Sequence, residues 1–178
     1  MISQMKTLVI VIHPNLETSV VNKTWMNRLK QENDITVHDL YGEYPNFIID
    51  VEKEQQLLLD HERIVFQFPM YWYSSPALLK QWEDDVLTHG WAFGTGGTKL
   101  HGKELLLAIS LGAQESDYQA GGDYNITISE LIRPFQVTAN YIGMRFLPAF
   151  TQYGTLHLSK EDVKNSAEKL VEYLKAEH

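Results

Sequence analysis

Three short segments of the sequence carry side chains that could bind a ligand that is both anionic and aromatic. The first runs from His13 to Asn22 and places an imidazole and the hydroxyl groups of Thr18 and Ser19 just before an apolar helical pattern. Unpaired N–H groups at the start of a helix, aided by such hydroxyls, favour a bound phosphate. A simple helix cap beside an ordinary loop histidine is the alternative interpretation.

The second segment has three consecutive aromatic residues, Tyr71, Trp72 and Tyr73, between an apolar strand pattern and a helical one. Three neighbours at such a junction cannot all point into the core, so at least one should face a cleft. Aromatic rings and backbone N–H groups can flank a planar heteroaromatic ring such as a flavin. Core packing or an oligomer interface explains the same residues equally well.

The third segment follows another apolar run and reads Ser110-Leu111-Gly112-Ala113, with Tyr118 five residues later. Glycine beside a small alanine lets the backbone approach a ligand closely, and the N–H groups there could donate to a flavin ring. Tyr118 could reach over that ligand. A plain turn is the alternative interpretation of this segment.

Composition excludes several classes of function. The 15 basic and 23 acidic side chains give a formal charge of −8, which repels nucleic acid, and no basic patch offsets it. The sequence has no cysteine, so disulfides and cysteine-based metal sites are excluded and redox chemistry would need a bound cofactor. The seven histidines show no close metal-ligand spacing. We therefore expect neither a nucleic-acid partner nor a metal site.

The location of the protein is inferred from two absences in the sequence. No apolar run approaches the roughly 18 residues of a membrane span. Residues 1–12 are too short for a signal peptide and run directly into a strand pattern. A cytoplasmic protein is the resulting expectation.

Apolar strand patterns alternate with helical patterns along the chain. Expected strands cover residues 6–12, 35–40, 63–68, 103–110 and, more briefly, 144–148. Expected helices begin after Thr18 or Ser19, cover 51–61, 76–89 and 125–140 with Pro134 as a site of bending, and begin again at Ser159. The alternation predicts one α/β domain over residues 1–178, with a doubly wound, five-stranded parallel sheet. Ligands bind outside the carboxyl ends of such strands, so the three segments should meet at one edge.

Four stretches taken together resemble the NAD(P)H dehydrogenase (quinone) family of flavodoxin-like proteins. They are His13-Pro-Asn-Leu-Glu-x-Ser19, the long stretch from Gln67 to Lys80, Ser110 to Ala113 with Tyr118, and Gly143-Met-x-x-Leu-Pro148. The likeness is greatest to the bacterial branch, which includes general-stress quinone reductases and ancillary flavoproteins of glutathione-gated potassium efflux systems. The resemblance covers nearly the whole chain and implies the sheet order 2-1-3-4-5.

The resemblance also implies roles for individual residues. The residues that would hold the flavin phosphate are His13, Ser19, Val20, Val21 and Asn22. Those that would line the flavin ring are Met70, Tyr71, Trp72 and Tyr73. Those that would form hydrogen bonds with the edge of the ring are Ser110, Leu111, Gly112 and Ala113. Tyr118 matches a tyrosine that, with a histidine, is thought to stabilise charge on the reduced flavin in relatives. The region of that histidine reads Gly122-Asp123-Tyr124 here. An obligatory acid–base pair is therefore not expected.

The implied activity is hydride transfer from NADH or NADPH through FMN, or FAD in its place, to a quinone-like acceptor by a ping-pong mechanism. The resemblance further implies a homodimer in which aromatic residues of the glycine-rich region, Trp91 and Phe93, are walls of the acceptor pocket. The alternative function is regulatory: a flavoprotein that docks on a membrane potassium transporter. A one-electron flavodoxin is a third interpretation, which the long loops at 93–102 and 111–122 disfavour because an electron carrier needs no acceptor pocket.

Overall fold

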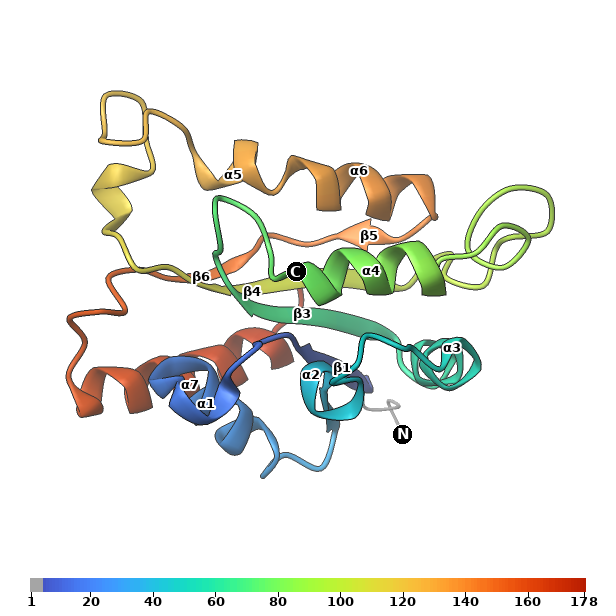
Figure 1. The fold of residues 1–178 in the computed structure, drawn as a ribbon, viewed down its shortest axis with the longest axis horizontal. Helices are drawn as coiled ribbons and strands as arrows, with labels where there is room; N and C mark the ends of the chain where they lie inside the picture. Colours follow the sequence, from blue (N-terminus) through green and yellow to red (C-terminus); the bar gives the residue numbers. More distant parts are fainter. Residues whose placement is uncertain (1–4) are drawn as a thin grey trace.

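A parallel sheet forms the centre of the computed structural model, which describes residues 5–178. Its strands are β1 (Thr7–Val11), β2 (Ile35–Asp39), β3 (Arg63–Pro69), β4 (Glu104–Ser110), β5 (Arg145–Phe146) and β6 (Phe150–Gln152). They lie in the order β2-β1-β3-β4-β5, and β6 also pairs with β4 (Figure 1). The flavodoxin-like sheet order expected from the sequence is confirmed.

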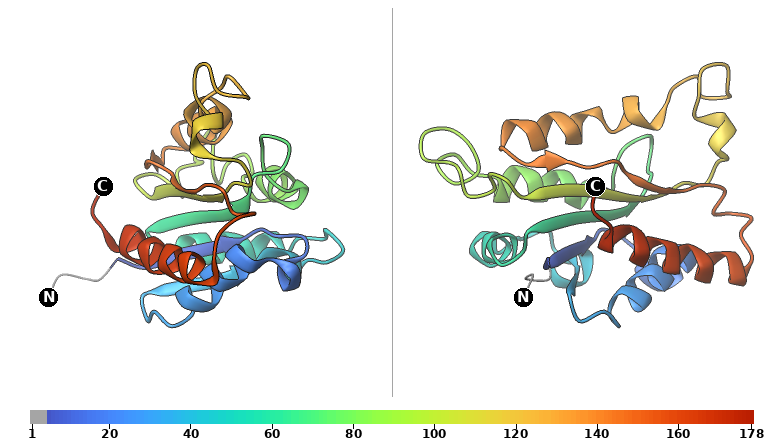
Figure 2. Two further views of the ribbon diagram at one scale, coloured as in Figure 1. Left: turned by 90° about the vertical axis from the view of Figure 1, so that its left-hand side faces the viewer. Right: turned by 180° about the vertical axis from the view of Figure 1, so that it is seen from behind.

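Helices cover both faces of the sheet (Figures 1 and 2). One face packs against α1 (Val20–Leu29) and α7 (Lys160–Lys175). The other face packs against α2 (Leu40–Glu43), α3 (Val51–Leu59), α4 (Ala77–Val86), α5 (Ile128–Leu131) and α6 (Arg133–Tyr141). Two-sided coverage explains why the strands of this sheet are continuous apolar runs. None of the helices in the described part of the chain combines the length and the apolar character needed to cross a bilayer.

Two expected elements are divided in the structure. The strand expected at 144–148 is β5 followed by a separate β6, because Pro148 between them has no N–H to give to a ladder. The helix expected at 125–140 is two helices that meet at Ile132, and Pro134 lies in the first turn of the second. Proline is tolerated there because first-turn N–H groups have no intrahelical acceptor. Pro134 therefore belongs to a helix start instead of a bend.

Helix caps set two further boundaries. The carboxylate of Asp39 accepts the N–H of Gly42 at 3.1 Å, so β2 ends there and the short α2 begins, where the sequence pattern had continued the strand to Leu40. At α7 the expected capping box is confirmed: Ser159 and Asp162 each accept a backbone N–H of the other at 3.1 Å.

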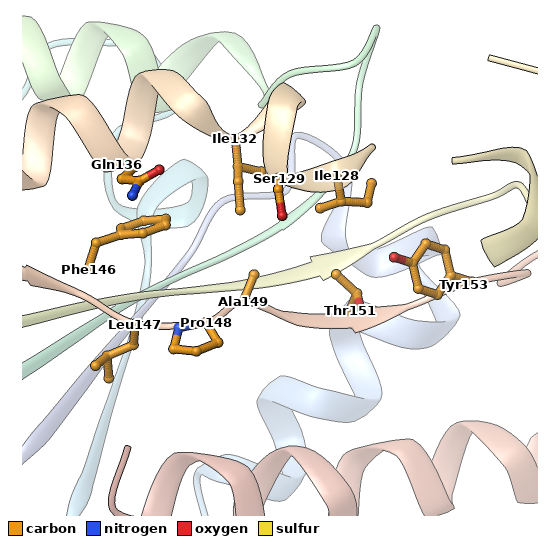
Figure 3. A pocket seen from close by; sticks show the side chains of 10 residues that line it. All are labelled: Ile128, Ser129, Ile132, Gln136, Phe146, Leu147, Pro148, Ala149, Thr151 and Tyr153. Atoms are coloured by element: carbon orange, nitrogen blue, oxygen red, sulfur yellow. The ribbon is translucent and has the colours of Figure 1, made fainter. Parts of the chain in front are cut away.

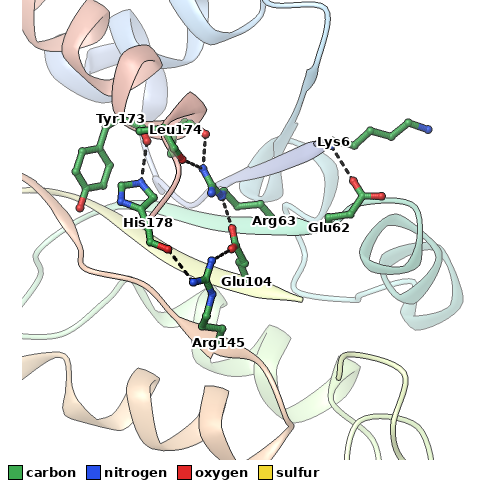
Figure 4. Close-up of polar contacts among 9 residues, drawn as sticks. Lys6, Glu62, Arg63, Glu104, Arg145, Tyr173, Leu174 and His178 are labelled. Carbon is green, nitrogen blue, oxygen red and sulfur yellow. Dashed lines mark hydrogen bonds and ion pairs between the residues drawn. The ribbon is translucent and has the colours of Figure 1, made fainter. Parts of the chain in front are cut away.

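A buried ion pair joins β3 to β4 at the amino ends of the two strands (Figure 4). Arg63, 2% exposed, donates to Glu104 at 2.7 Å and to the carbonyl of Leu174 near the end of α7 at 2.5 Å. Arg145 on β5 pairs with the other oxygen of Glu104. These guanidinium groups hold the pKa of the Glu104 carboxyl below its usual value despite its burial. The cluster fixes strand register at the edge opposite the three predicted ligand segments.

A small apolar cavity between α4, α6 and the sheet contains a carboxylate. Glu83 lines it together with apolar side chains that include Trp82, Leu100 and Met144. Burial raises the pKa of Glu83 to about 7, with Lys80 opposing and Asp84 adding to the effect. The folded protein thus favours the protonated carboxyl, and this contribution to stability is complete at low pH and is lost as the pH rises through 7.

We expect Glu83→Gln to be more stable than the unmodified protein at pH 8, by about 1–3 kcal/mol, because the amide cannot ionise. The difference should shrink toward pH 4.5, where the carboxyl is protonated in the folded state. Urea unfolding at the two pH values measures it, with Glu172→Gln on the exposed side of α7 as the matched control. An equal difference at both pH values would contradict the raised pKa.

Candidate functional site

The three consecutive aromatic residues form a tight, strained turn at the carboxyl end of β3. Tyr71 and Ser74 exchange two backbone hydrogen bonds of 3.0 Å, so Trp72 and Tyr73 are the central residues of the turn. Both have positive φ, 48° and 63°, a conformation that glycine or asparagine usually supplies. The turn leaves the Trp72 side chain 92% exposed. Strain of this kind is concentrated at ligand-binding loops.

A cavity of about 490 Å³ lies between this turn and the loop that follows β4. Its lining includes six of the residues predicted to lie at a flavin ring: Met70, Trp72, Tyr73, Gly112, Ala113 and Tyr118. The Met70 N–H donates to the Ser110 carbonyl at 2.9 Å, which fixes the turn to the end of β4. The second and third predicted segments therefore meet at one edge of the sheet.

Five residues that the sequence patterns did not single out complete the cavity wall: Gln114, Asp117, Tyr124, Leu156 and His157. Leu156 and His157 follow β6, a strand whose sequence is too short to be recognised. Gln114 and Asp117 lie in the 111–122 loop, where the Gln114 N–H donates to the Asp117 carboxylate at 2.8 Å and closes the 3₁₀ turn Glu115–Asp117. The loop after β4 is thus an ordered wall of the cavity.

Tyrosine rings pack against one another beside the cavity in tilted and edge-to-face arrangements. Tyr118 contacts Tyr124 with ring centroids 4.9 Å apart and Tyr153 at 5.9 Å, and Tyr124 contacts Tyr73 at 5.3 Å. Burial first, and then the neighbouring Tyr124, Tyr73 and Asp117, raise the pKa of Tyr118 to about 12. Its phenol therefore stays protonated at physiological pH and is available as a neutral hydrogen-bond donor.

The predicted phosphate segment lies at the start of α1. Ser19 is the N-cap, and its hydroxyl accepts the N–H of Asn22 at 3.2 Å. The N–H groups of Val20 and Val21 are in the first turn, where no intrahelical acceptor exists. Two backbone donors and a helix dipole are thus available for an anion.

His13 lies beside this segment and contacts the aromatic turn. Its Nδ1 accepts the N–H of Asn15 at 3.1 Å, so in the neutral ring the proton is on Nε2. Burial lowers the pKa of His13, and the charge of Asp39 opposes the shift only in part. The ring centroid lies 6.2 Å from that of Tyr71. His13 is therefore a neutral Nε2–H donor that connects the first segment with the second.

Besides Val21, whose side chain is 5% exposed, three of the predicted ligand residues face the protein interior. The side chains of Asn22 and Ser110 are 2% and 6% exposed and bond to each other at 2.9 Å. Leu111 is fully buried, its N–H donates to the Gln152 carbonyl, and its own carbonyl accepts the N–H of Thr155. None of the three lines the 490 Å³ cavity, so any effect on a ligand there is exerted through other residues.

The glycine-rich loop occupies the opposite edge of the sheet (Figure 1). It leads into the amino end of β4, and its Gly102 N–H donates to the Gly143 carbonyl at 2.9 Å. Trp91 and Phe93 of this loop do not line the 490 Å³ cavity of their own chain. The expectation that they are walls of an acceptor pocket therefore stays a prediction that involves a second copy.

A second hollow of about 440 Å³ lies where α5 and α6 pass over the edge strands β5 and β6 (Figure 3). Its walls are uncharged and mix apolar side chains with the hydroxyls of Ser129, Thr151 and Tyr153 and the amide of Gln136. Tyr153 contacts Tyr118 of the first cavity. No residue of the three predicted segments lines this hollow.

A family model described as having a flavodoxin-like fold matches residues 5–176. The chain belongs to this flavodoxin-like family. A relative named uncharacterized NAD(P)H oxidoreductase YrkL from Bacillus subtilis (strain 168) is 97% identical over 174 residues, which are 98% of this chain and 100% of the relative. A second relative is KefG from Yersinia pestis (strain Pestoides F), an ancillary protein of a glutathione-regulated potassium-efflux system. It is 40% identical over 176 residues, which are 99% of this chain and 97% of KefG.

Solved structures agree with this assignment. General stress protein 14 from Treponema denticola, in complex with FMN, has a TM-score of 0.92 at 44% identity, covering 95% of this chain and 97% of its own. An NADPH-quinone reductase from P. pentosaceus has a TM-score of 0.87 at 38% identity over the same shares. A chain described as a thermophilic tryptophan halogenase from Streptomycin violaceusniger has a TM-score of 0.94 at 51% sequence identity. The match covers 96% of this chain and 99% of that one. The predicted resemblance is confirmed, while the activities in these names differ within the flavodoxin-like family.

Strain in the aromatic turn predicts an unusual stability difference. We expect Trp72→Gly to be more stable than Trp72→Ala by about 1 kcal/mol in the absence of ligand, because only glycine adopts positive φ without steric cost. Alanine is the better residue at ordinary loop positions, so the sign is diagnostic. Urea unfolding of both variants measures it. Equal stabilities, or a more stable alanine variant, would contradict the strained turn.

Proposed function

We propose that this protein binds FMN and uses it to oxidise NADH or NADPH, with a quinone as the acceptor. The observation that carries the proposal is the 490 Å³ cavity at the carboxyl edge of the sheet, with an aromatic turn on one side and exposed loop backbone at Gly112 and Ala113 on the other. FMN in a 44% identical structure and NADPH-quinone reductase as the name of another support the same cofactor and acceptor.

The residues present fit a flavin with a single phosphate. The first-turn N–H groups of Val20 and Val21, the Ser19 hydroxyl and the neutral Nε2–H of His13 would hold the phosphate without a basic side chain. Met70, Trp72 and Tyr73 would contact the ring, with the backbone at Gly112 and Ala113 on its edge. Loading the protein with FAD in parallel with FMN tests which of the two flavins it prefers.

Bound flavin would supply the hydride chemistry, accepting from a nicotinamide and passing on to a quinone that enters after the nicotinamide has left. The chain itself would contribute proximity, exclusion of water and neutral donors. Tyr118, protonated because its pKa is raised to about 12, would donate a hydrogen bond and remain neutral. Tyr124 packs against Tyr118 in the region where relatives are expected to have the histidine, so we propose no obligatory acid–base pair there, although His157 also lines the cavity.

A second candidate function is regulatory, and the 40% identical potassium-efflux ancillary protein favours it. In that case bound flavin or nicotinamide would alter a surface that docks on a membrane transporter, and turnover would be incidental. The two functions differ in whether reduced flavin is reoxidised quickly by a quinone.

An absorption titration distinguishes these functions. After FMN is added and excess removed, we expect oxidised-flavin bands that bleach with NADPH and return with benzoquinone under anaerobic conditions. A parallel loading with FAD identifies the preferred flavin. Flavin that is retained but bleaches slowly would favour the regulatory function, and a protein that retains no flavin would refute the proposed site.

A homodimer would complete the acceptor pocket. On α6, Val137 and Tyr141 are 58% and 69% exposed, and the ring of Phe93 packs on Tyr141 with centroids 5.7 Å apart. Exposed apolar groups on one helix and the adjacent loop are typical of a protein interface. Since this surface lies away from the cavity of its own chain, a second copy is the partner we propose for it.

Sedimentation equilibrium tests the dimer. At micromolar concentration we expect a mass of about twice 20.5 kDa, and Tyr141→Glu should shift it toward the monomer because a carboxylate would be buried in the interface. Asn165→Glu, on the exposed side of α7, adds the same charge elsewhere and should leave the mass unchanged. A monomeric unmodified protein would contradict the proposal.

A further inference from the structure

Three buried polar side chains meet beneath the proposed flavin site. Asn22 donates from Nδ2 to the hydroxyl of Ser110 at 2.9 Å, and Gln67 donates from Nε2 to the Asn22 carbonyl at 3.1 Å and to its Oδ1 at 3.3 Å. Asn22 is 2% exposed, Ser110 6% and Gln67 0%. These three residues, the Asn22 cluster, come from three different elements: the first turn of α1, the end of β4 and β3.

Two members of the Asn22 cluster, Asn22 and Ser110, are also bonded to segments that would touch the flavin. The Asn22 N–H donates to Ser19, the cap of the phosphate end, at 3.2 Å. The Ser110 carbonyl accepts the N–H of Met70, the residue just before the aromatic turn, at 2.9 Å. One amide side chain therefore connects the phosphate end of the site with the ring end.

Stability alone does not account for polar residues here. Gln67 lies on a strand that is buried along its whole length, and its Oε1 is buried without a hydrogen-bond partner in the described residues. An unsatisfied buried carbonyl destabilises the folded state, and an apolar side chain of similar volume would avoid that penalty. Buried polar groups that are retained at such a cost often specify one geometry among several.

We infer that Asn22 is a positioning residue that fixes the distance between the phosphate donors of α1 and the ring-binding loops. The inference rests on the proposed function and assigns Asn22 an indirect role, since its side chain is committed to Ser110 and Gln67. A ligand that spans both ends gains from binding two sites at once only when their separation is fixed. The phosphate of FMN should therefore contribute less affinity once the amide is removed.

Comparison of FMN with riboflavin, which lacks the phosphate, tests the inference. Flavin fluorescence gives both dissociation constants for the unmodified protein, for Asn22→Leu and for Asn27→Leu, an exposed asparagine on the same helix. We expect the ratio of the riboflavin constant to the FMN constant to fall at least tenfold in Asn22→Leu and to be unchanged in Asn27→Leu. A general loss of packing would weaken both flavins alike and leave the ratio unaltered.

Ser110→Ala provides a second test if Asn22→Leu does not fold, because it removes only the acceptor of the 2.9 Å bond. It should lower the same ratio by a smaller factor. A folded variant with an unchanged ratio would overturn the positioning role and leave the flavin proposal standing. An unmodified protein that binds neither FMN nor riboflavin would instead refute the proposed function.

Discussion

The parallel ladder between β3 and β4 is the constraint on which the site depends. Seven consecutive residue pairs run from Arg63 opposite Glu104 to Pro69 opposite Ser110. At one end the buried guanidinium of Arg63 and carboxylate of Glu104 neutralise each other. At the other end the Ser110 carbonyl accepts the N–H of Met70, just before the aromatic turn. A slip of one residue would separate the charges and exchange the two faces of the strand. The register thus fixes where the cavity forms.

Much of this arrangement could be predicted from residue patterns, because buried parallel strands have continuous apolar sequences. The order of the sheet and the meeting of the second and third segments follow from strands that end at a common edge. The strand expected at 144–148 was found as β5, but the three-residue β6 escaped recognition because its pairing depends on β4 and not on local sequence. The residues that follow β6 in the cavity wall were missed for the same reason.

Side-chain direction was harder to predict than position. Leu111 lies within a segment next to the cavity, yet its side chain is in the core and its backbone groups are bonded elsewhere. Asn22 has a residue type suited to a ligand but is taken up by a partner 88 positions away, which no local pattern reveals. The pKa shifts of His13 and Tyr118 also needed the structure, since burial lowers the first and raises the second. Both side chains are neutral, so His13 and Tyr118 offer dipoles in place of charges in a chain of net charge −8.

Exposure of Trp72 gives this protein an internal optical reporter. Of its four tryptophans, Trp25 and Trp82 are buried at 0% and 1% exposure and Trp91 is half-buried at the opposite edge. Trp72 alone among them stands in water on a rigid turn beside the cavity. Emission from the buried indoles is shielded from small soluble quenchers, so the quenchable part of the intrinsic fluorescence belongs mainly to one side chain. Quenching of the Trp72 fluorescence by a soluble quencher therefore reports whether the entrance of the cavity is covered.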